Sequence, residues 1–206
     1  MNQNLLILGA GQYGSVVKEI ANELGFFQRI VFLDDCHGKD SSNFGKETIG
    51  KLDEYERFLN DYTYAIPAIG NPVVRLELLQ KLEESGFRIP ILVSTSAYVS
   101  PSAHLEPGVV IEPLAGVHAN SYVGKGSYIS MGAVVNHNAV VAECCHIDNN
   151  AVVMSGALVA DGVTTEPCEV VRRNAVAFEK QTRQFDGNEE WVKEHMKSNG
   201  REPSMF

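Results

Sequence analysis

"AVVNHNAVVAECCHIDNNAVVMSGALV", residues 133–159, carries an aliphatic residue at every sixth position. The same period runs from residue 99 to residue 171, where twelve of the thirteen positions are aliphatic and only Thr165 departs. Two residues before each of these positions, ten of thirteen residues are Ala, Ser or Cys. Helices repeat every 3.6 residues and strands every two, so neither explains a period of six. The pattern predicts a β-solenoid in which three hexads close one triangular coil of 18 residues, with the aliphatic side chains inside.

The preceding residues alternate between strand and helix patterns. Strands are expected over 4–10, 29–35, 64–70 and 88–93, helices over 11–25, 52–61 and 72–86, and a connector over 36–50. Such alternation is typical of a small parallel sheet with crossover helices. We therefore predict a Rossmann-like half domain over residues 1–93, a β-helix over 94–176, and a tail over 177–206 with a short helix around Trp191.

Composition narrows the class of protein. A net charge of −9 and a pI near 5.1 argue against nucleic-acid binding. The short apolar run at the N-terminus leads directly into a glycine motif, and no apolar run is long enough to span a bilayer. The four cysteines show no metal-binding spacing. We expect a cytoplasmic protein with reduced thiols, no metal, and no nucleic-acid or membrane partner.

The glycine motif follows the first expected strand. Gly9, Gly11 and Gly14 have the GxGxxG spacing that lets backbone N–H groups and a helix N-terminus approach a phosphate. Asp34 and Asp35 end the second strand, where a ribose or base is read. About 95 residues make only half of a dinucleotide fold, so a nucleotide with one sugar, such as a UDP-sugar, suits the site better than NAD. A purely structural glycine turn is the alternative.

The whole order of motifs resembles one family. The glycine loop "GAGQYG", the "FLDD" at 32–35, "AIGN" followed by Arg75, "SAYVSPSAHL" and "VVNHNAVV" around His137 together resemble the hexapeptide-repeat acyltransferases. Within these, the resemblance is to the sialic-acid O-acetyltransferases and nucleotide-amino-sugar N-acetyltransferases, and it covers roughly residues 1 to 160. It implies a left-handed β-helix, a homotrimer with sites between subunits, and acetyl-CoA as co-substrate.

The resemblance also implies roles for particular residues. His137 stands where the family carries its catalytic base, with Asn138 and Glu143 as candidates to orient it. The other implied contacts fall in two groups. The acceptor sugar nucleotide would meet Gly9, Gly11, Gln12, Tyr13, Asp34, Asp35, Gly70, Asn71 and Arg75, and the acyl-CoA would meet His146, Ser155, Gly156 and Ala157.

Three features depart from the family pattern. Asn138 replaces the usual acid after the catalytic histidine, Tyr13 replaces a frequent histidine in the glycine loop, and the repeat weakens at Thr165 and Glu169. His137 and His146 are half a coil apart, so one chain cannot bring them together, but two neighbouring prisms can. We expect acetyl transfer to an amino or hydroxyl group of a nucleotide-activated sugar at such a composite site.

Two other functions compete with this expectation. A zinc carbonic anhydrase on the same scaffold needs an H-x4-H spacing that the solenoid histidines lack, since they are His104, His118, His137 and His146. A non-enzymatic or regulatory sugar-nucleotide-binding protein would keep the scaffold and release no CoA thiol.

Overall fold

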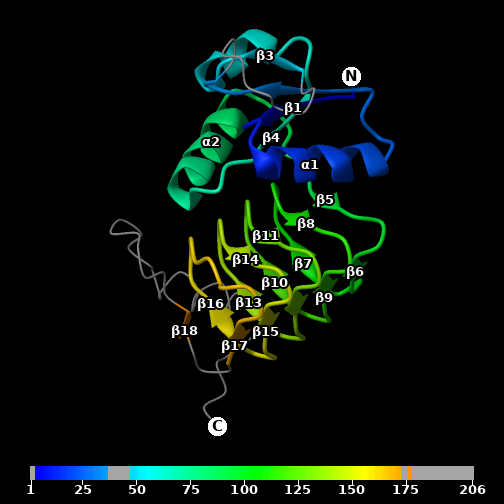
Figure 1. Ribbon diagram of the computed structural model, residues 1–206, viewed down its shortest axis with the longest axis vertical. Helices are drawn as coiled ribbons and strands as arrows, with labels where there is room; N and C mark the ends of the chain where they lie inside the picture. Colours follow the sequence, from blue (N-terminus) through cyan, green and yellow to red (C-terminus); the bar gives the residue numbers. More distant parts are fainter. Residues whose placement is uncertain (1–2, 37–46, 173–175, 178–206) are drawn as a thin grey trace.

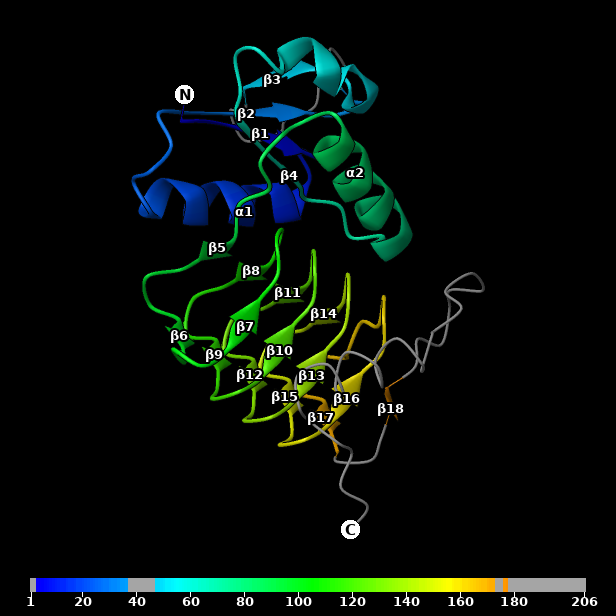
Figure 2. The ribbon, with the colours of Figure 1, turned by 180° about the vertical axis from the view of Figure 1, so that it is seen from behind.

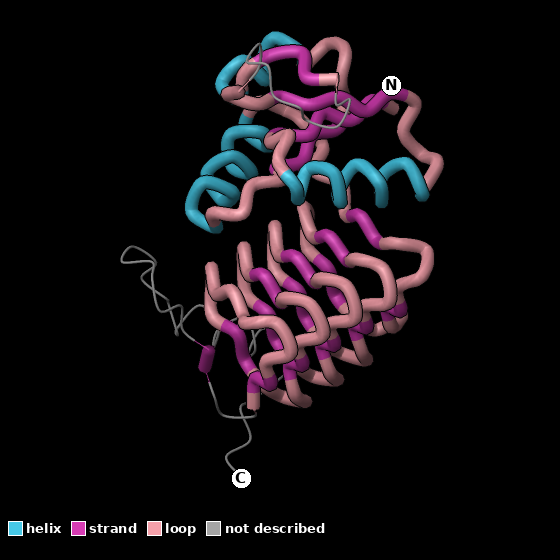
Figure 3. The backbone as a smooth tube through the Cα atoms, in the orientation of Figure 1, coloured by secondary structure: helices cyan, strands magenta, loops and turns pink. Residues whose placement is uncertain are grey.

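The computed structural model describes residues 3–36, 47–172 and 176–177. An α/β domain at the N-terminus sits on a triangular prism of stacked coils (Figure 1). All described helices belong to the N-terminal domain, while the prism consists of short strands and turns (Figure 3). The expected tail helix around Trp191 lies outside the described residues. No helix among the described residues has the length and apolar character needed to cross a membrane.

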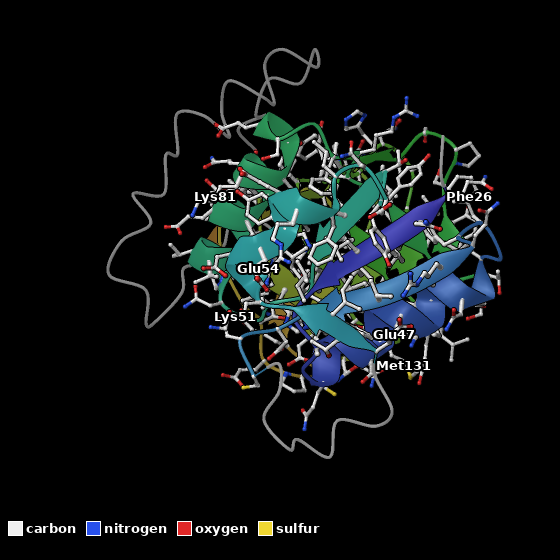
Figure 4. The ribbon with its side chains drawn as sticks, turned by 90° about the horizontal axis from the view of Figure 1, so that it is seen from above. Phe26, Glu47, Lys51, Glu54, Lys81 and Met131 are labelled. Atoms are coloured by element: carbon white, nitrogen blue, oxygen red, sulfur yellow. The ribbon has the colours of Figure 1, made fainter. Side chains whose placement is uncertain are left out.

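The N-terminal sheet is parallel, with strand order β3-β2-β1-β4. After its first residue, each of the two central strands is a buried apolar run, which is the pattern of a sheet covered on both faces. Glu54 accepts a hydrogen bond from the Lys51 backbone N–H at 2.8 Å and so closes the start of η1 (Figure 4). The elements are β1 (Asn4–Leu8), α1 (Gln12–Glu23), β2 (Arg29–Leu33), β3 (Thr48–Gly50), the 3-10 helix η1 (Leu52–Phe58), β4 (Tyr64–Pro67) and α2 (Pro72–Glu84).

Two local predictions differ from the structure. The connector expected over 36–50 contains strand β3, which pairs with β2 through Phe32 and Leu33. The strand expected over 88–93 does not close the N-terminal sheet. Only Arg88 bridges to Tyr64, whereas β5 (Leu92–Val93) pairs with Val110–Ile111 of the prism. The first strand of the β-helix therefore begins at Leu92.

The prism is a parallel β-helix with three sheets, as the period predicts, and it is left-handed, as the family resemblance implies. Strands 18 residues apart pair in parallel, for example Tyr122 with Val140. The sheet orders are β14-β11-β8-β5, β17-β15-β12-β9-β6 and β18-β16-β13-β10-β7. The remaining strands are β6 (Tyr98–Val99), β7 (His104–Leu105), β8 (Val110–Ile111), β9 (Gly116–Val117), β10 (Tyr122–Val123), β11 (Tyr128–Ile129), β12 (Val134–Val135), β13 (Val140–Val141), β14 (His146–Ile147), β15 (Val152–Val153), β16 (Leu158–Val159), β17 (Val170–Val171) and β18 (Val176–Ala177).

Each corner of the prism turns through a left-handed residue. Positive φ angles recur at every sixth residue from Gly108 to Cys168, and five of these eleven positions are glycine. Asn120, Asn138 and Asn150 supply three more, because asparagine tolerates this conformation better than other side chains. The turns therefore keep the period of the inward aliphatic residues.

The repeat extends further than its sequence pattern. Thr165 is buried, and its hydroxyl accepts the Asp148 backbone N–H at 2.8 Å. Its polar atom is thus satisfied inside the coil, and β17 and β18 still pair with β15 and β16. Thr165 breaks the aliphatic pattern without ending the solenoid.

The N-terminal domain packs on one face of the prism, the sheet β14-β11-β8-β5 (Figure 2). Val17 and Ile20 of α1 share an apolar cluster with Leu92, Val110 and Tyr128. From α2, Glu83 pairs with Lys125 at 2.9 Å. The glycine loop at the start of α1 is thereby held over the β-helix.

Candidate active site

The glycine loop joins β1 to α1. A Cβ at Gly9, where φ is +112°, would lie 2.8 Å from the Ala68 carbonyl oxygen, and one at Gly14 would lie 2.2 Å from the Gly9 oxygen. Both glycines are therefore required by packing. A Cβ at Gly11 would meet no atom within 4 Å, and Gly11 and Gln12 are exposed. The open side of the loop is at Gly11.

The two acids after β2 bind backbone groups. The Asp34 carboxylate accepts the Ala10 N–H at 2.7 Å and the Cys36 N–H at 2.8 Å, which ties the glycine loop to the second strand. Asp35 is exposed and accepts the Leu52 N–H at 3.2 Å. These bonds shape the rim of the loop, and contact of either acid with a ligand remains a prediction.

The "GN" after β4 begins α2. Asn71 caps the helix by accepting the N–H groups of Val73 at 3.0 Å and Val74 at 3.2 Å. Gly70 is exposed, and a Cβ there would meet nothing within 4 Å. A ligand role for these two residues also remains a prediction.

Arg75 lies in the junction between the two domains and is 1% exposed. Its guanidinium donates to carbonyl oxygens of both domains, and it covers the Tyr128 ring at 4.0 Å from the centroid. Because the donors are directed at backbone carbonyls, the residue fastens α2 to the β-helix. The acceptors are Ile69 (2.7 Å), Gly70 (3.2 Å), Gly126 (2.9 Å), Cys144 (2.5 Å) and Cys145 (3.4 Å).

Tyr13 places the glycine loop against the prism. Its ring stacks on Tyr128 with centroids 4.1 Å apart, and His146 meets both rings edge-on at 5.8 and 5.9 Å. The Tyr128 hydroxyl donates to the Pro67 oxygen at 2.9 Å. His146 thus lies on the face of the β-helix that carries the N-terminal domain, beside the first turn of α1.

Two residues that the sequence reading missed hold His146. Ser130 Oγ lies 2.8 Å from His146 Nε2 and donates to Glu112 Oε1 at 3.2 Å. Glu112 is buried, and its Oε2 accepts the Met131 N–H at 3.0 Å. Burial raises the pKa of Glu112 and lowers the pKa of His146. Glu112, Ser130 and Asp148 follow one another at intervals of 18 residues, one in each successive coil. Writing the sequence in rows of 18 residues therefore places the three in one column.

His137 occupies a different corner. It is exposed in the turn between β12 and β13, and its Nδ1 lies 3.1 Å from the Asn138 amide nitrogen. One coil further on are three of the four predicted CoA contacts. Gly156 donates its N–H to the His137 carbonyl at 3.3 Å, Ser155 is half-buried beside it, and the Ala157 side chain is buried inside the coil.

Glu143 lies at the far end of β13 from His137. Its backbone N–H donates to the Asp161 carboxylate at 2.9 Å. Burial raises the pKa of Glu143, and the nearby Asp161 adds to the effect. Among the described residues of one chain the hydrogen-bond partner of the His137 ring is Asn138, and His137 and His146 lie on different parts of the prism. Among the described residues no group of His, Cys, Asp and Glu is arranged to hold a metal ion.

Comparisons with known proteins agree with this architecture. A family model described as the PglD N-terminal domain matches residues 4–82. The acetyltransferase domain of PglB from Neisseria gonorrhoeae FA1090, solved in complex with acetyl coenzyme A, is 28% identical, with a TM-score of 0.71 over 84% of this chain and 92% of that one. PerB from Caulobacter crescentus, in complex with CoA and GDP-perosamine, is 23% identical, with a TM-score of 0.71 over 85% of this chain and 91% of that one. Residues 4–82 thus match the PglD N-terminal domain family, and most of the chain is similar to a solved acetyltransferase domain.

Proposed function

We propose that this protein transfers an acetyl group from acetyl-CoA to an amino or hydroxyl group of a nucleotide-activated sugar. The observation that carries the proposal is the similarity over nearly the whole chain to an acetyltransferase domain solved with acetyl coenzyme A. The glycine loop, open at Gly11, would receive the nucleotide of the acceptor, for example a UDP-sugar. With acetyl-CoA as donor, the proposed compartment is the cytoplasm.

We propose further that three copies form the active sites between them. The outward face of the sheet β17-β15-β12-β9-β6 is apolar, with Tyr98 58% and Val170 45% exposed and Val134 and Val152 half-buried. A continuous apolar face of this kind favours contact with another protein surface. The turn that carries His137 begins where β12 of this sheet ends, so a subunit packed there would lie next to His137.

The proposed reaction is a direct transfer. The His137 imidazole of one subunit removes a proton from the acceptor as its nitrogen or oxygen attacks the thioester carbonyl. Backbone N–H groups of the β-helix stabilise the oxyanion. When the C–S bond breaks, the imidazolium returns the proton to sulfur, and the products are the acetylated sugar and CoA-SH. The sugar and His146 come from the neighbouring subunit.

The test is release of CoA thiol from acetyl-CoA with a panel of UDP- and GDP-amino-sugars and sialic acid. Wild type should release thiol only with an acceptor, and His137→Ala should lose the acceptor-dependent rate. The matched control is His104→Ala, since His104 is also exposed but lies on β7 beside Tyr122. Absence of acceptor-dependent release across the panel, or an unchanged rate in His137→Ala, would contradict the proposal.

A further inference from the structure

Glu112 is a buried acid whose two oxygens have different fixed partners. The Met131 backbone N–H donates to Oε2 and the Ser130 hydroxyl donates to Oε1. Among the described residues no lysine or arginine forms an ion pair with this carboxylate. A backbone N–H can only donate, so the Oε2 bond fixes the orientation of the carboxyl group. Ionised Glu112 can only accept, and the proton of Ser130 must then point toward it.

The direction of this bond determines the state of His146. A serine hydroxyl has one proton, and when it is directed at Glu112 the oxygen meets His146 as an acceptor. With Glu112 ionised, the 2.8 Å contact with Nε2 therefore requires a proton on Nε2. Burial lowers the pKa of His146 and favours the neutral ring. Its other nitrogen, Nδ1, then carries a lone pair, since the side-chain hydrogen bond of His146 among the described residues runs through Nε2.

The surroundings of His146 indicate what this lone pair meets. The ring lies beside Tyr13 at the start of α1, and the buried Tyr13 hydroxyl lies against the Glu112 carboxylate, which helps to raise the pKa of Tyr13. A lone pair accepts a hydrogen bond from an N–H or O–H group, but it repels the carbonyl oxygen of a thioester. The glycine loop side of His146 is where the proposed function puts the acceptor sugar.

We propose that Glu112 and Ser130 are positioning residues that hold His146 as a hydrogen-bond acceptor for the amine or hydroxyl of the sugar. This inference rests on the proposed function. It assigns His146 to the acceptor, in place of the acyl-CoA contact expected from the sequence. The hydrogen-bonded series Glu112, Ser130 and His146, here called the relay, aligns the attacking atom, while His137 of the neighbouring subunit removes the proton.

The relay predicts that Glu112→Gln inverts the tautomer of His146. This change can be observed without catalytic turnover. In Glu112→Gln the carboxamide oxygen must accept the Met131 N–H, so its NH2 group faces Ser130 and donates to Oγ. Ser130 then directs its proton to His146 Nε2, and the imidazole proton moves to Nδ1. Nitrogen-15 NMR of the full chain with labelled histidine distinguishes the two tautomers, and the signal lost in His146→Gln identifies the residue.

The matched control is Asp148→Asn, which removes an acid one coil further along the same column. Asp148 raises the pKa of His146, but its carboxylate binds the Asn149 backbone N–H rather than Ser130. The expected result is Nε2–H in wild type and in Asp148→Asn, and Nδ1–H in Glu112→Gln. An unchanged tautomer in Glu112→Gln would overturn the relay.

Steady-state kinetics test the assignment to the acceptor. Glu112→Gln and Ser130→Ala should lower kcat/KM for the acceptor about tenfold and leave KM for acetyl-CoA unchanged. A rise in KM for acetyl-CoA alone would overturn the assignment. If wild type releases no CoA with any acceptor, the proposed function fails, while the tautomer experiment still decides whether the relay exists.

Discussion

The side-chain amide of Asn138 lies 3.1 Å from Nδ1 of His137, with its nitrogen facing the ring. An NH2 group donates, so in this arrangement Nδ1 is the acceptor and the ring proton sits on Nε2. A histidine that removes a proton through Nε2 needs the opposite tautomer. The amide must then turn its oxygen to the ring, and it offers no charge to stabilise the imidazolium.

Asn138→Asp should therefore make the enzyme faster. A carboxylate can only accept, so it holds the proton on Nδ1 and stabilises the charged ring. Asp tolerates the φ of +57° at this corner, so the turn should survive. We expect acceptor-dependent CoA release to rise roughly tenfold or more, given the size of the aspartate effect in catalytic triads. Asn150→Asp, at another corner with φ +57°, is the control and should leave the rate unchanged. An equal or slower rate in Asn138→Asp would argue against His137 as the base.

Substitutions at two glycines of the loop should separate an effect on stability from an effect on nucleotide binding. Gly14→Ala puts a Cβ on the Gly9 oxygen, so the free energy of unfolding should fall by about 1–3 kcal/mol. Gly11→Ser has space for its side chain and a favourable residue at the helix N-cap, so stability should stay within about 0.5 kcal/mol. Its affinity for the nucleotide-sugar should nevertheless fall, because the new side chain occupies the open side of the loop. Denaturant unfolding and calorimetric titration measure the two effects. Unchanged affinity in Gly11→Ser would mean that the nucleotide binds elsewhere.

Arg75 should contribute strongly to stability because it joins the two domains. Arg75→Met removes the donors to the carbonyls of Ile69 in the N-terminal domain and of Gly126 and Cys144 in the β-helix, and we expect a loss of about 2–4 kcal/mol in denaturant unfolding. The control is Lys125→Met, which removes the partly exposed pair with Glu83 from the same junction and should cost about 1 kcal/mol or less. Similar losses in both variants would contradict the fastening role of Arg75.

Glu143 should make the folded protein less stable at neutral pH. Burial raises the pKa of Glu143 in the folded state, so ionising this group costs the folded state free energy once the pH is above that pKa. Glu143→Gln should therefore be more stable than wild type at pH 7, and the difference should vanish as acid protonates the carboxyl in both states. Thermal unfolding across pH measures this, with Glu77→Gln on the exposed side of α2 as the control for charge removal. A destabilised Glu143→Gln would indicate that the carboxylate has a favourable partner.

The period of six was enough to predict the prism, because the inward residue and the left-handed corner recur together in every hexad. The same pattern suggests that the solenoid weakens at Thr165. The structure continues there because the Thr165 hydroxyl accepts a backbone N–H inside the coil. Leu92 was assigned to the wrong sheet because a two-residue strand carries no signal of its partner. Glu112 and Ser130 were missed because their relation is an 18-residue stacking, visible only when the coils are laid over one another.

The central claim is an acetyl-transfer site built from His137 of one subunit and His146 of the next, and subunit mixing tests it most directly. His137→Ala and His146→Ala are each expected to be inactive as pure proteins. In trimers reassembled from an equal mixture, about one interface in four pairs two intact histidines, so roughly a quarter of the wild-type CoA release should return. A mixture no more active than its parents would contradict the account and would put both histidines in one subunit's site.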